Sequence, residues 1–260
     1  MKLNFRRIGI FLISMGFDPR KTKKSLFGLF YFLRDFFSFY FNYKKDKYSQ
    51  FKFRFLPILS DFKSSSGTAS GHYFHQDLWA AKRIFLRNPK IHVDVGSRVD
   101  GFIAHLLVFR PVIVLDIREL YSRVDGLKFI QFDITNKYKR SDLKTKSLSC
   151  LHSLEHFGLG RYMDNIDVNG WKAGLRNLSS ILEPEGILYL SVPIGPQTIE
   201  FNAQRIFSPK TIVDEAYKNG LVLNNFSFVD DKGDFYENTK MDDSNSCQYG
   251  CGCFEFTLKN

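Results

Sequence analysis

The sequence lacks several features that secreted, membrane-spanning and dinucleotide-binding proteins need. Only four cysteines occur in 260 residues, three of them clustered near the C-terminus. This is no disulfide framework, so a reducing cytoplasm is expected. No apolar run reaches the roughly 20 residues of a bilayer-spanning helix. The strand–helix turn at residues 96–101 has glycines only at its two ends, which disfavours a nicotinamide-dependent oxidoreductase.

Acidic residues are scarce in the first 55 residues, which contain 13 Lys/Arg and 3 Asp/Glu. The remaining residues contain 24 of each kind, so all ten net positive charges belong to the N-terminal segment. An electroneutral body disfavours an enzyme with a basic nucleic-acid channel, and no nucleic-acid partner is expected.

The chain is organised around residues 91–120, which read as strand, tight turn, helix and strand. The first strand, residues 91–95, leads directly into Gly96. Four apolar residues in a row, 112–115, are typical of a strand buried on both faces, and Asp116 ends it, 20 residues after Gly96. A glycine turn lets the backbone approach a ligand, and an acidic residue after the next strand can accept hydrogen bonds from a ribose diol. This stretch therefore predicts a nucleoside-cofactor site.

The rest of the chain continues the alternation of strands and helices. Strands are expected at residues 127–132, 147–151 and 187–192, and helices at residues 73–86, 102–109, 170–182 and 209–219. The connection between the second and third strands is short for a crossover helix and leaves room for one turn near residues 119–122. Residues 183–186 read as a turn, and residues 221–229 and 253–258 as a closing antiparallel pair. This alternation predicts an α/β sheet.

Several segments resemble a domain-of-unknown-function family of methyltransferase-like proteins: GHYFHQDLWAAKRI, HVDVGSRVDGFIAHLL, VLDIR, SLEHFGLGRYMDNID and FNAQRIFSP. The resemblance runs from about Pro57 to the C-terminus. It implies the Rossmann-like fold of class I S-adenosylmethionine-dependent methyltransferases, a mostly parallel seven-stranded sheet with helices on both faces. We therefore expect a helical extension over residues 1–55, a methyltransferase-like domain over residues 56–260, and S-adenosylmethionine as the cofactor.

The predicted cofactor site lies at the carboxyl ends of the first three strands. Its expected residues are Asp94, Gly96, Ser97, Gly101, Asp116, Ile117, Asp133 and Ile134. Asp116 is the candidate partner of the ribose hydroxyls and Asp133 that of the adenine amino group. Either aspartate could equally be the cap of a following helix.

On the acceptor side, His156 is the candidate general base and His152 the second candidate, because imidazole titrates near neutral pH. Either histidine could instead order its loop by a hydrogen bond. The expected acceptor contacts are Trp79, Asp164, Asp167, Glu200, Asn202 and Arg205. His72 and Gln204 are expected near the same cleft. Asp164 and Asp167 could bind sugar hydroxyls or a metal ion, and could equally be turn residues. Aromatic and polar groups together suit a sugar hydroxyl or amine of a glycan or glycolipid precursor as the acceptor.

The N-terminal 55 residues contain 17 Phe or Tyr side chains. Asp18 and Pro19 predict the start of a helix. Within it, residues 26–41 have almost no polar face, yet they are too few and too interrupted by charge to span a membrane. The apolar side chains of this run must be shielded from water by another surface. The alternatives are packing against the body or in a homodimer, and peripheral binding to the inner face of a membrane through the flanking lysines.

The sequence thus predicts a cytoplasmic methyltransferase. The alternative is a methyltransferase-like binding or assembly module that has lost catalysis, which Arg98 in the cofactor turn and the short second connection favour. A metal site at Cys247, Cys251 and Cys253 lacks a fourth ligand nearby in the sequence, so packed free thiols are expected and no metal is predicted.

Overall fold

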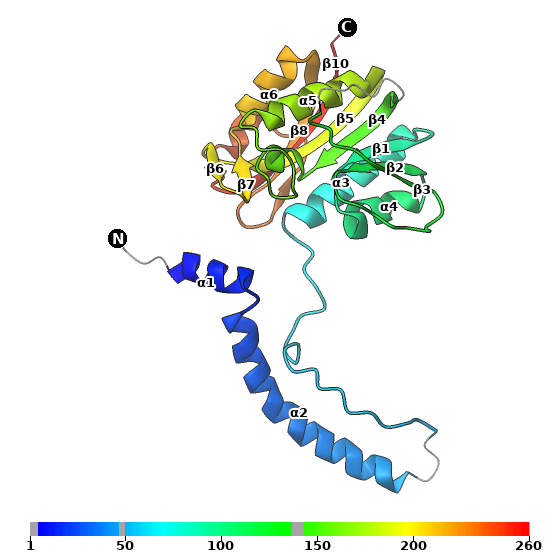
Figure 1. The fold of residues 1–260 in the computed structure, drawn as a ribbon, viewed down its shortest axis with the longest axis vertical. Helices are drawn as coiled ribbons and strands as arrows, with labels where there is room; N and C mark the ends of the chain where they lie inside the picture. Colours follow the sequence, from blue (N-terminus) through cyan, green and yellow to red (C-terminus); the bar gives the residue numbers. More distant parts are fainter. Residues whose placement is uncertain (1–4, 47–49, 137–142, 260) are drawn as a thin grey trace. The chain divides into compact units, whose positions relative to one another are not determined.

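The computed structural model describes residues 5–46, 50–136 and 143–259. The chain forms two compact units, Met1–Thr68 and Ala69–Asn260 (Figure 1). The division falls after Thr68 rather than after Phe55, because residues 51–62 run back along the long helix of the first unit and contact its rings.

The first unit consists of helix α1 (Phe5–Ser14), helix α2 (Pro19–Lys45) and the returning segment. The predicted start of α2 is confirmed, since Asp18 Oδ1 accepts hydrogen bonds from the backbone N–H groups of Arg20 and Lys21. The ring of Phe62 stacks on that of Tyr31 with 4.5 Å between centroids. The returning backbone also passes so close to Gly28 that a Cβ there would lie 1.9 Å from the carbonyl oxygen of Leu59.

The apolar side chains of α2 remain largely open to solvent. Gly28 is the one buried residue of the helix, and Leu26 and Phe30 are 69% and 71% exposed. Among the described residues, no helix combines the length and the apolar character that crossing a bilayer requires.

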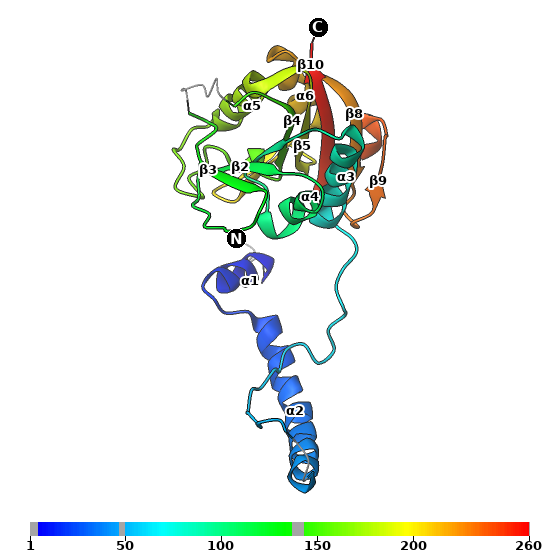
Figure 2. The same cartoon turned by 90° about the vertical axis from the view of Figure 1, so that its right-hand side faces the viewer.

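The second unit is built on one sheet with the strand order β3-β2-β1-β4-β5-β10-β8-β9 (Figure 2). Strands β1 to β5 run parallel to one another, and β10 is inserted antiparallel between β5 and β8. The strands are β1 (His92–Val95), β2 (Val112–Asp116), β3 (Leu127–Gln131), β4 (Thr145–Leu151), β5 (Leu182–Ile194), β8 (Leu221–Val229), β9 (Phe235–Tyr236) and β10 (Gly250–Leu258). The predicted closing pair of antiparallel strands is confirmed.

Helices cover both faces of this sheet, as predicted (Figure 1). On one face, α5 and α6 pack through residues such as Leu175 and Ile212. On the other face, α3, η1 and α4 pack through residues such as Ile84 and Phe102. The bounds are α3 (His72–Arg87), the π-helix η1 (Val99–Ile103), α4 (Ala104–Leu107), the 3-10 helix η2 (Leu154–His156), α5 (Gly170–Ile181), α6 (Pro209–Lys218) and the 3-10 helix η3 (Met241–Ser244). Strands β6 (Thr198–Glu200) and β7 (Gln204–Ile206) form a separate hairpin.

Two local predictions were wrong. No helical turn forms near residues 119–122, because the backbone bends back directly after β2, where the Arg118 N–H donates to Asp116 Oδ1 at 2.8 Å. The turn expected at residues 183–186 lies inside β5. The pairing with β4 passes there from Thr145–Leu182 to Ser147–Ile187, so the extra residues form a bulge, with Glu185 at a φ of 63°.

Candidate functional site

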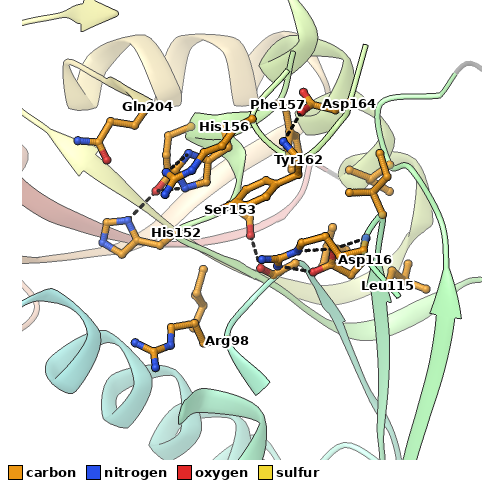
Figure 3. A pocket seen from close by; sticks show the side chains of 18 of the residues that line it. Arg98, Leu115, Asp116, His152, Ser153, His156, Phe157, Tyr162, Asp164 and Gln204 are labelled. Carbon is orange, nitrogen blue, oxygen red and sulfur yellow. Dashed lines mark hydrogen bonds and ion pairs between the residues drawn. The ribbon is translucent and has the colours of Figure 1, made fainter. Parts of the chain in front are cut away.

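A cavity of about 450 Å³ opens at the carboxyl ends of β1 to β4. The strand order reverses there, since β2 and β3 lie on one side of β1 and β4 and β5 on the other, and this is where open α/β sheets bind ligands. In Figure 3, Leu115 and Asp116 face His152, His156 and Gln204 across the cavity. The predicted residues that line it are Gly96, Asp116, Ile117, Asp133, Ile134, Asp164, His152 and His156.

Gly96 occupies a position that only glycine fits. Its φ is 73°, in the left-handed region, and a Cβ there would lie 2.6 Å from the Ser153 hydroxyl oxygen. That hydroxyl donates to the Gly96 carbonyl at 2.6 Å. The turn after β1 is therefore tied to the loop after β4, and its bare backbone borders the cavity.

Asp94 and Ser97 were predicted to bind the cofactor, but they lie beneath the turn and do not line the cavity. Asp94 is fully buried. It accepts hydrogen bonds from the Ser97 N–H at 3.0 Å, the Ser97 hydroxyl at 2.6 Å and the Ser149 hydroxyl at 2.5 Å. Burial raises the pKa of Asp94 to about 6, although these hydrogen bonds oppose the shift. Asp94 and Ser97 therefore stabilise the conformation of the turn from its buried side.

Gly101 also lies outside the cavity lining. It belongs to η1, and a Cβ there would lie 2.8 Å from Asp77 Oδ2 of α3, so its lack of a side chain serves helix packing. Arg98 does line the cavity. Its guanidinium pairs with Asp100 at 2.9 Å and lies 5.4 Å from the centroid of the Tyr73 ring, with 56% of the side chain exposed.

Asp116 and Asp133 follow neighbouring strands, as predicted, and both already accept local hydrogen bonds. The Arg118 guanidinium binds Asp116 through Nε to Oδ1 at 2.9 Å and Nη2 to Oδ2 at 2.6 Å. Thr135 donates its N–H and its hydroxyl to Asp133 Oδ1 at 2.8 and 2.7 Å. Among the described residues no helix follows either aspartate before the next strand, so these hydrogen bonds order the turn after each strand rather than cap a helix. Both aspartates also line the cavity.

His152 and Glu155 form a buried pair on the opposite side. Nδ1 of His152 lies 2.7 Å from Glu155 Oε1, and these side chains are 4% and 1% exposed. The carboxylate accepts, so Nδ1 carries a proton, and in the neutral tautomer the lone pair is on Nε2. Nε2 is buried and has no hydrogen-bond partner among the described residues. His72 stacks on His152, with 5.3 Å between ring centroids, and burial is the main cause that lowers its pKa to about 4.

His156 also borders Glu155, with Nε2 3.8 Å from Oε1. Its Nδ1 donates to the carbonyl of Ala203 at 2.7 Å, which leaves the lone pair on Nε2. Burial lowers the pKa of His156, and the nearby Glu155 opposes that shift. The imidazole is therefore neutral near pH 7 and can accept a proton.

Most of the expected acceptor contacts lie away from the cavity. Trp79 is buried against Tyr189 in the sheet core, and Asp167 Oδ1 accepts from the Asn169 N–H at the start of α5. Glu200 and Asn202 lie on the exposed β6–β7 hairpin. The buried Arg205 donates to backbone carbonyls of the loop after β4, including that of Phe157 at 2.7 Å. Asp164 lines the cavity, although its carboxylate also binds three backbone N–H groups as a turn residue.

The structure adds cavity residues that the sequence reasoning did not select: Tyr73, Arg118, Ser153, Glu155, Phe157, Arg161, Tyr162 and Tyr249. Glu155 had a visible signal, since HSLEH places three titratable groups within five residues. Tyr249 had none, because it lies almost a hundred residues farther along the chain.

Comparison with known proteins gives one family match. A family model described as "Caenorhabditis protein of unknown function, DUF268" matches residues 92–231, which is more than half of the chain. No curated protein matches the chain.

Among solved structures, the CcbJ methyltransferase from Streptomyces caelestis is similar with a TM-score of 0.52 and 10% identity over 77% of this chain and 95% of that one. The 1,6-didemethyltoxoflavin-N1-methyltransferase of Burkholderia thailandensis was solved with S-adenosylhomocysteine. It gives a TM-score of 0.51 and 13% identity over 71% of this chain and 79% of that one. The 4+2 cyclase SpnF gives a TM-score of 0.51 and 10% identity over 71% of this chain and 81% of that one. At these identities the likeness confirms the predicted Rossmann-like fold and leaves the reaction to the site.

Proposed function

We propose that this chain, which belongs to the DUF268 family, is an S-adenosylmethionine-dependent methyltransferase. The observation that carries the proposal is the cavity itself. Gly96, Asp116 and Asp133 lie there on the ends of three adjacent parallel strands, at the point where the strand order reverses. These features suit a nucleoside. The glycine turn lets the backbone approach the ligand, and the two carboxylates can accept hydrogen bonds from its ribose hydroxyls and its amino group.

The donor half of the cavity is the side formed by β1, β2 and β3. Asp116 is the partner we assign to the ribose hydroxyls and Asp133 the partner of the adenine amino group. Ile117 and Ile134 follow them and supply apolar wall. Bound there, the cofactor would supply an electrophilic methyl group, and the protein's task is to orient an acceptor toward it and to accept a proton.

The acceptor half lies toward the loop after β4. We assign the general base to His156, because its Ala203 hydrogen bond fixes the tautomer with a free Nε2 lone pair. A proton accepted at Nε2 would lie beside Glu155, whose carboxylate stabilises the imidazolium. Tyr73, Tyr162 and Tyr249 surround this half of the cavity with Gln204. Rings next to polar groups suit a sugar, so we infer a hydroxyl or amine of a glycan or glycolipid precursor as the acceptor.

The extension suggests where such an enzyme works. Leu26 and Phe30 on α2 are exposed, and lysines such as Lys24 and Lys44 lie on the same helix. We propose that α2 binds the inner face of a membrane peripherally, where lipid-linked acceptors would be at hand. The alternative is that a second copy of the chain packs against these side chains in a homodimer.

Calorimetric titration with S-adenosylhomocysteine tests the function. The unaltered chain should bind, and Asp116→Ala should weaken binding by about 1–3 kcal/mol, or roughly 5- to 150-fold in Kd, because a ribose hydroxyl loses its acceptor. Asp125→Ala is the matched control, since Asp125 is exposed and its hydrogen bond goes to the Gly126 N–H. If the unaltered chain gives no heat at millimolar ligand, the cofactor assignment is wrong and a non-catalytic module becomes the better description.

A further inference from the structure

Three side chains from distant parts of the sequence meet beside the acceptor half of the cavity. His72 begins α3, His152 follows β4, and Cys251 lies in β10. One ligand-type atom of each lies within 4.8 Å of the other two. In the sequence, the cysteine cluster near the C-terminus lacks enough nearby ligands for a metal site. The fold supplies two histidines to one of those cysteines, and Cys247 and Cys253 stay outside the group.

The Nε2 atom of His152 is available to bind a further atom. Its Nδ1 proton is held by Glu155 at 2.7 Å, and its Nε2 lone pair is buried without a partner among the described residues. Buried polar atoms in folded proteins are nearly always satisfied, so this nitrogen needs a further partner, which a metal ion or a water molecule would supply. A carboxylate bound to the second ring nitrogen is the usual support of a metal-binding histidine, because it fixes the tautomer and makes the ligand nitrogen more basic. Glu155 occupies that position.

From this arrangement we propose that His72, His152 and Cys251 form a site for Zn²⁺ or a chemically similar divalent transition-metal ion, with Glu155 as the support of His152.

The kind of ion follows from the donor atoms. Two imidazole nitrogens and one sulfur suit zinc or cobalt and do not suit magnesium or calcium, which need oxygen. With Zn–N of about 2.0 Å and Zn–S of about 2.3 Å, two ligand atoms on one tetrahedral ion lie roughly 3.3–3.6 Å apart. Small side-chain rotations would bring the three atoms from within 4.8 Å to that spacing. Binding would release the Cys251 thiol proton, because the thiolate is the ligand.

The position of the ligands implies an open site. His72 and His152 line the cavity, whereas Cys251 is fully buried and does not line it. Three protein ligands leave a fourth position, and the two histidines border the cavity from which water or a substrate atom would reach it. A closed structural site would use four protein ligands, so this one resembles the catalytic type, in which water or a substrate atom completes the coordination. The inference does not depend on S-adenosylmethionine binding, since no donor-side residue takes part.

Metal titration of the full chain after removal of ions with a chelator tests the site. Cobalt is the probe, because a thiolate ligand gives a charge-transfer band and tetrahedral coordination gives intense visible bands. One equivalent should bind. Cys251→Ser should abolish the charge-transfer band, whereas Cys253→Ser, equally buried on the same strand, should retain it. Glu155→Gln should lower the affinity roughly 10- to 100-fold.

A second matched pair keeps the test decisive if the buried cysteine variant fails to fold. His72→Ala should lower cobalt affinity at least tenfold, whereas His75→Ala, one turn along α3 and also half-buried, should not. Absence of the charge-transfer band in the unaltered chain, or equal losses within each matched pair, would overturn the site. Calorimetry with S-adenosylhomocysteine on the same metal-free protein reports on the proposed function separately, so either idea can fail alone.

Discussion

Replacing Asp94 with Asn should make the stability of the protein less sensitive to pH. Burial raises the pKa of Asp94 from 3.8 to about 6, so the folded protein binds this proton more tightly than the unfolded chain does. A raised carboxyl pKa stabilises the folded state fully below the unfolded pKa, and that contribution is lost as pH rises through the folded pKa. A shift of 6 − 3.8 = 2.2 units corresponds to about 3 kcal/mol lost between about pH 4 and pH 6.

The Asn variant should keep the hydrogen bonds of the buried group. Its amide oxygen can accept from the Ser97 N–H, and its NH₂ can donate to the hydroxyls of Ser97 and Ser149, which occupy the same positions. Near pH 4 the two proteins should therefore differ little in stability. Near pH 7 the variant should be the more stable, by up to about 3 kcal/mol.

Urea unfolding of both proteins across this pH range measures the difference directly. Other titratable groups contribute equally to the free energy of unfolding of both proteins, so their contributions cancel in that difference. His92, whose pKa burial lowers to about 3, is present in both proteins and shifts stability in the opposite direction. A difference that stays constant from pH 4 to pH 7 would refute the reasoning, and would mean that Asp94 is ionised in the folded protein at low pH.

Three further predictions concern the turn, the base and the extension. Gly96→Ala should weaken S-adenosylhomocysteine binding at least tenfold in calorimetry, because its φ of 73° and the Ser153 hydroxyl exclude a Cβ; Gly220→Ala, with a φ of 77° and open space around it, is the control. His156→Gln should lower methyl transfer roughly 100-fold with little change in Tm, and a fall in Tm with normal turnover would make His156 structural. The full chain should float with anionic vesicles at low salt, and a Leu26→Gln/Phe30→Gln double variant should not; soluble fractions for both would favour a dimer interface.

Much of the fold could be predicted because it depends on local patterns. Four apolar residues before Asp116 identify a buried strand, and β2 ends there. Asp18 and Pro19 identify the start of α2, and both perform that role. One of the two errors arose where pairing between strands decides the structure. Residues 183–186 look like a turn by themselves, and only the register of β4 against β5 makes them a bulge within a strand.

The site was less accessible to sequence reasoning, because a residue's type does not reveal which way its side chain points. Asp94 lies in β1 and Ser97 in the turn that follows, but both side chains point into the protein, where they bind each other and stabilise the turn. Arg205 follows β5 as an acceptor contact would, yet it is buried against backbone carbonyls. The approach of Cys251 to His72 and His152 depends on β10 being inserted beside β5, and no spacing in the sequence contains that information.

The ion pair between Asp116 and Arg118 determines how ligand binding at this carboxylate must proceed. The guanidinium already donates to the carboxylate oxygens that a ribose diol would use, so the proposed nucleoside binding would be an exchange of partners. Arg118 is 48% exposed and also lies over the Tyr162 ring at 4.5 Å. Asp116 is only 12% exposed, so this ion pair can contribute more than the roughly 1 kcal/mol of a fully exposed pair. A buried ribose hydroxyl without an acceptor costs about 1–3 kcal/mol. The two contributions are of similar size, so the proposed diol would compete with a guanidinium that already holds the carboxylate in place.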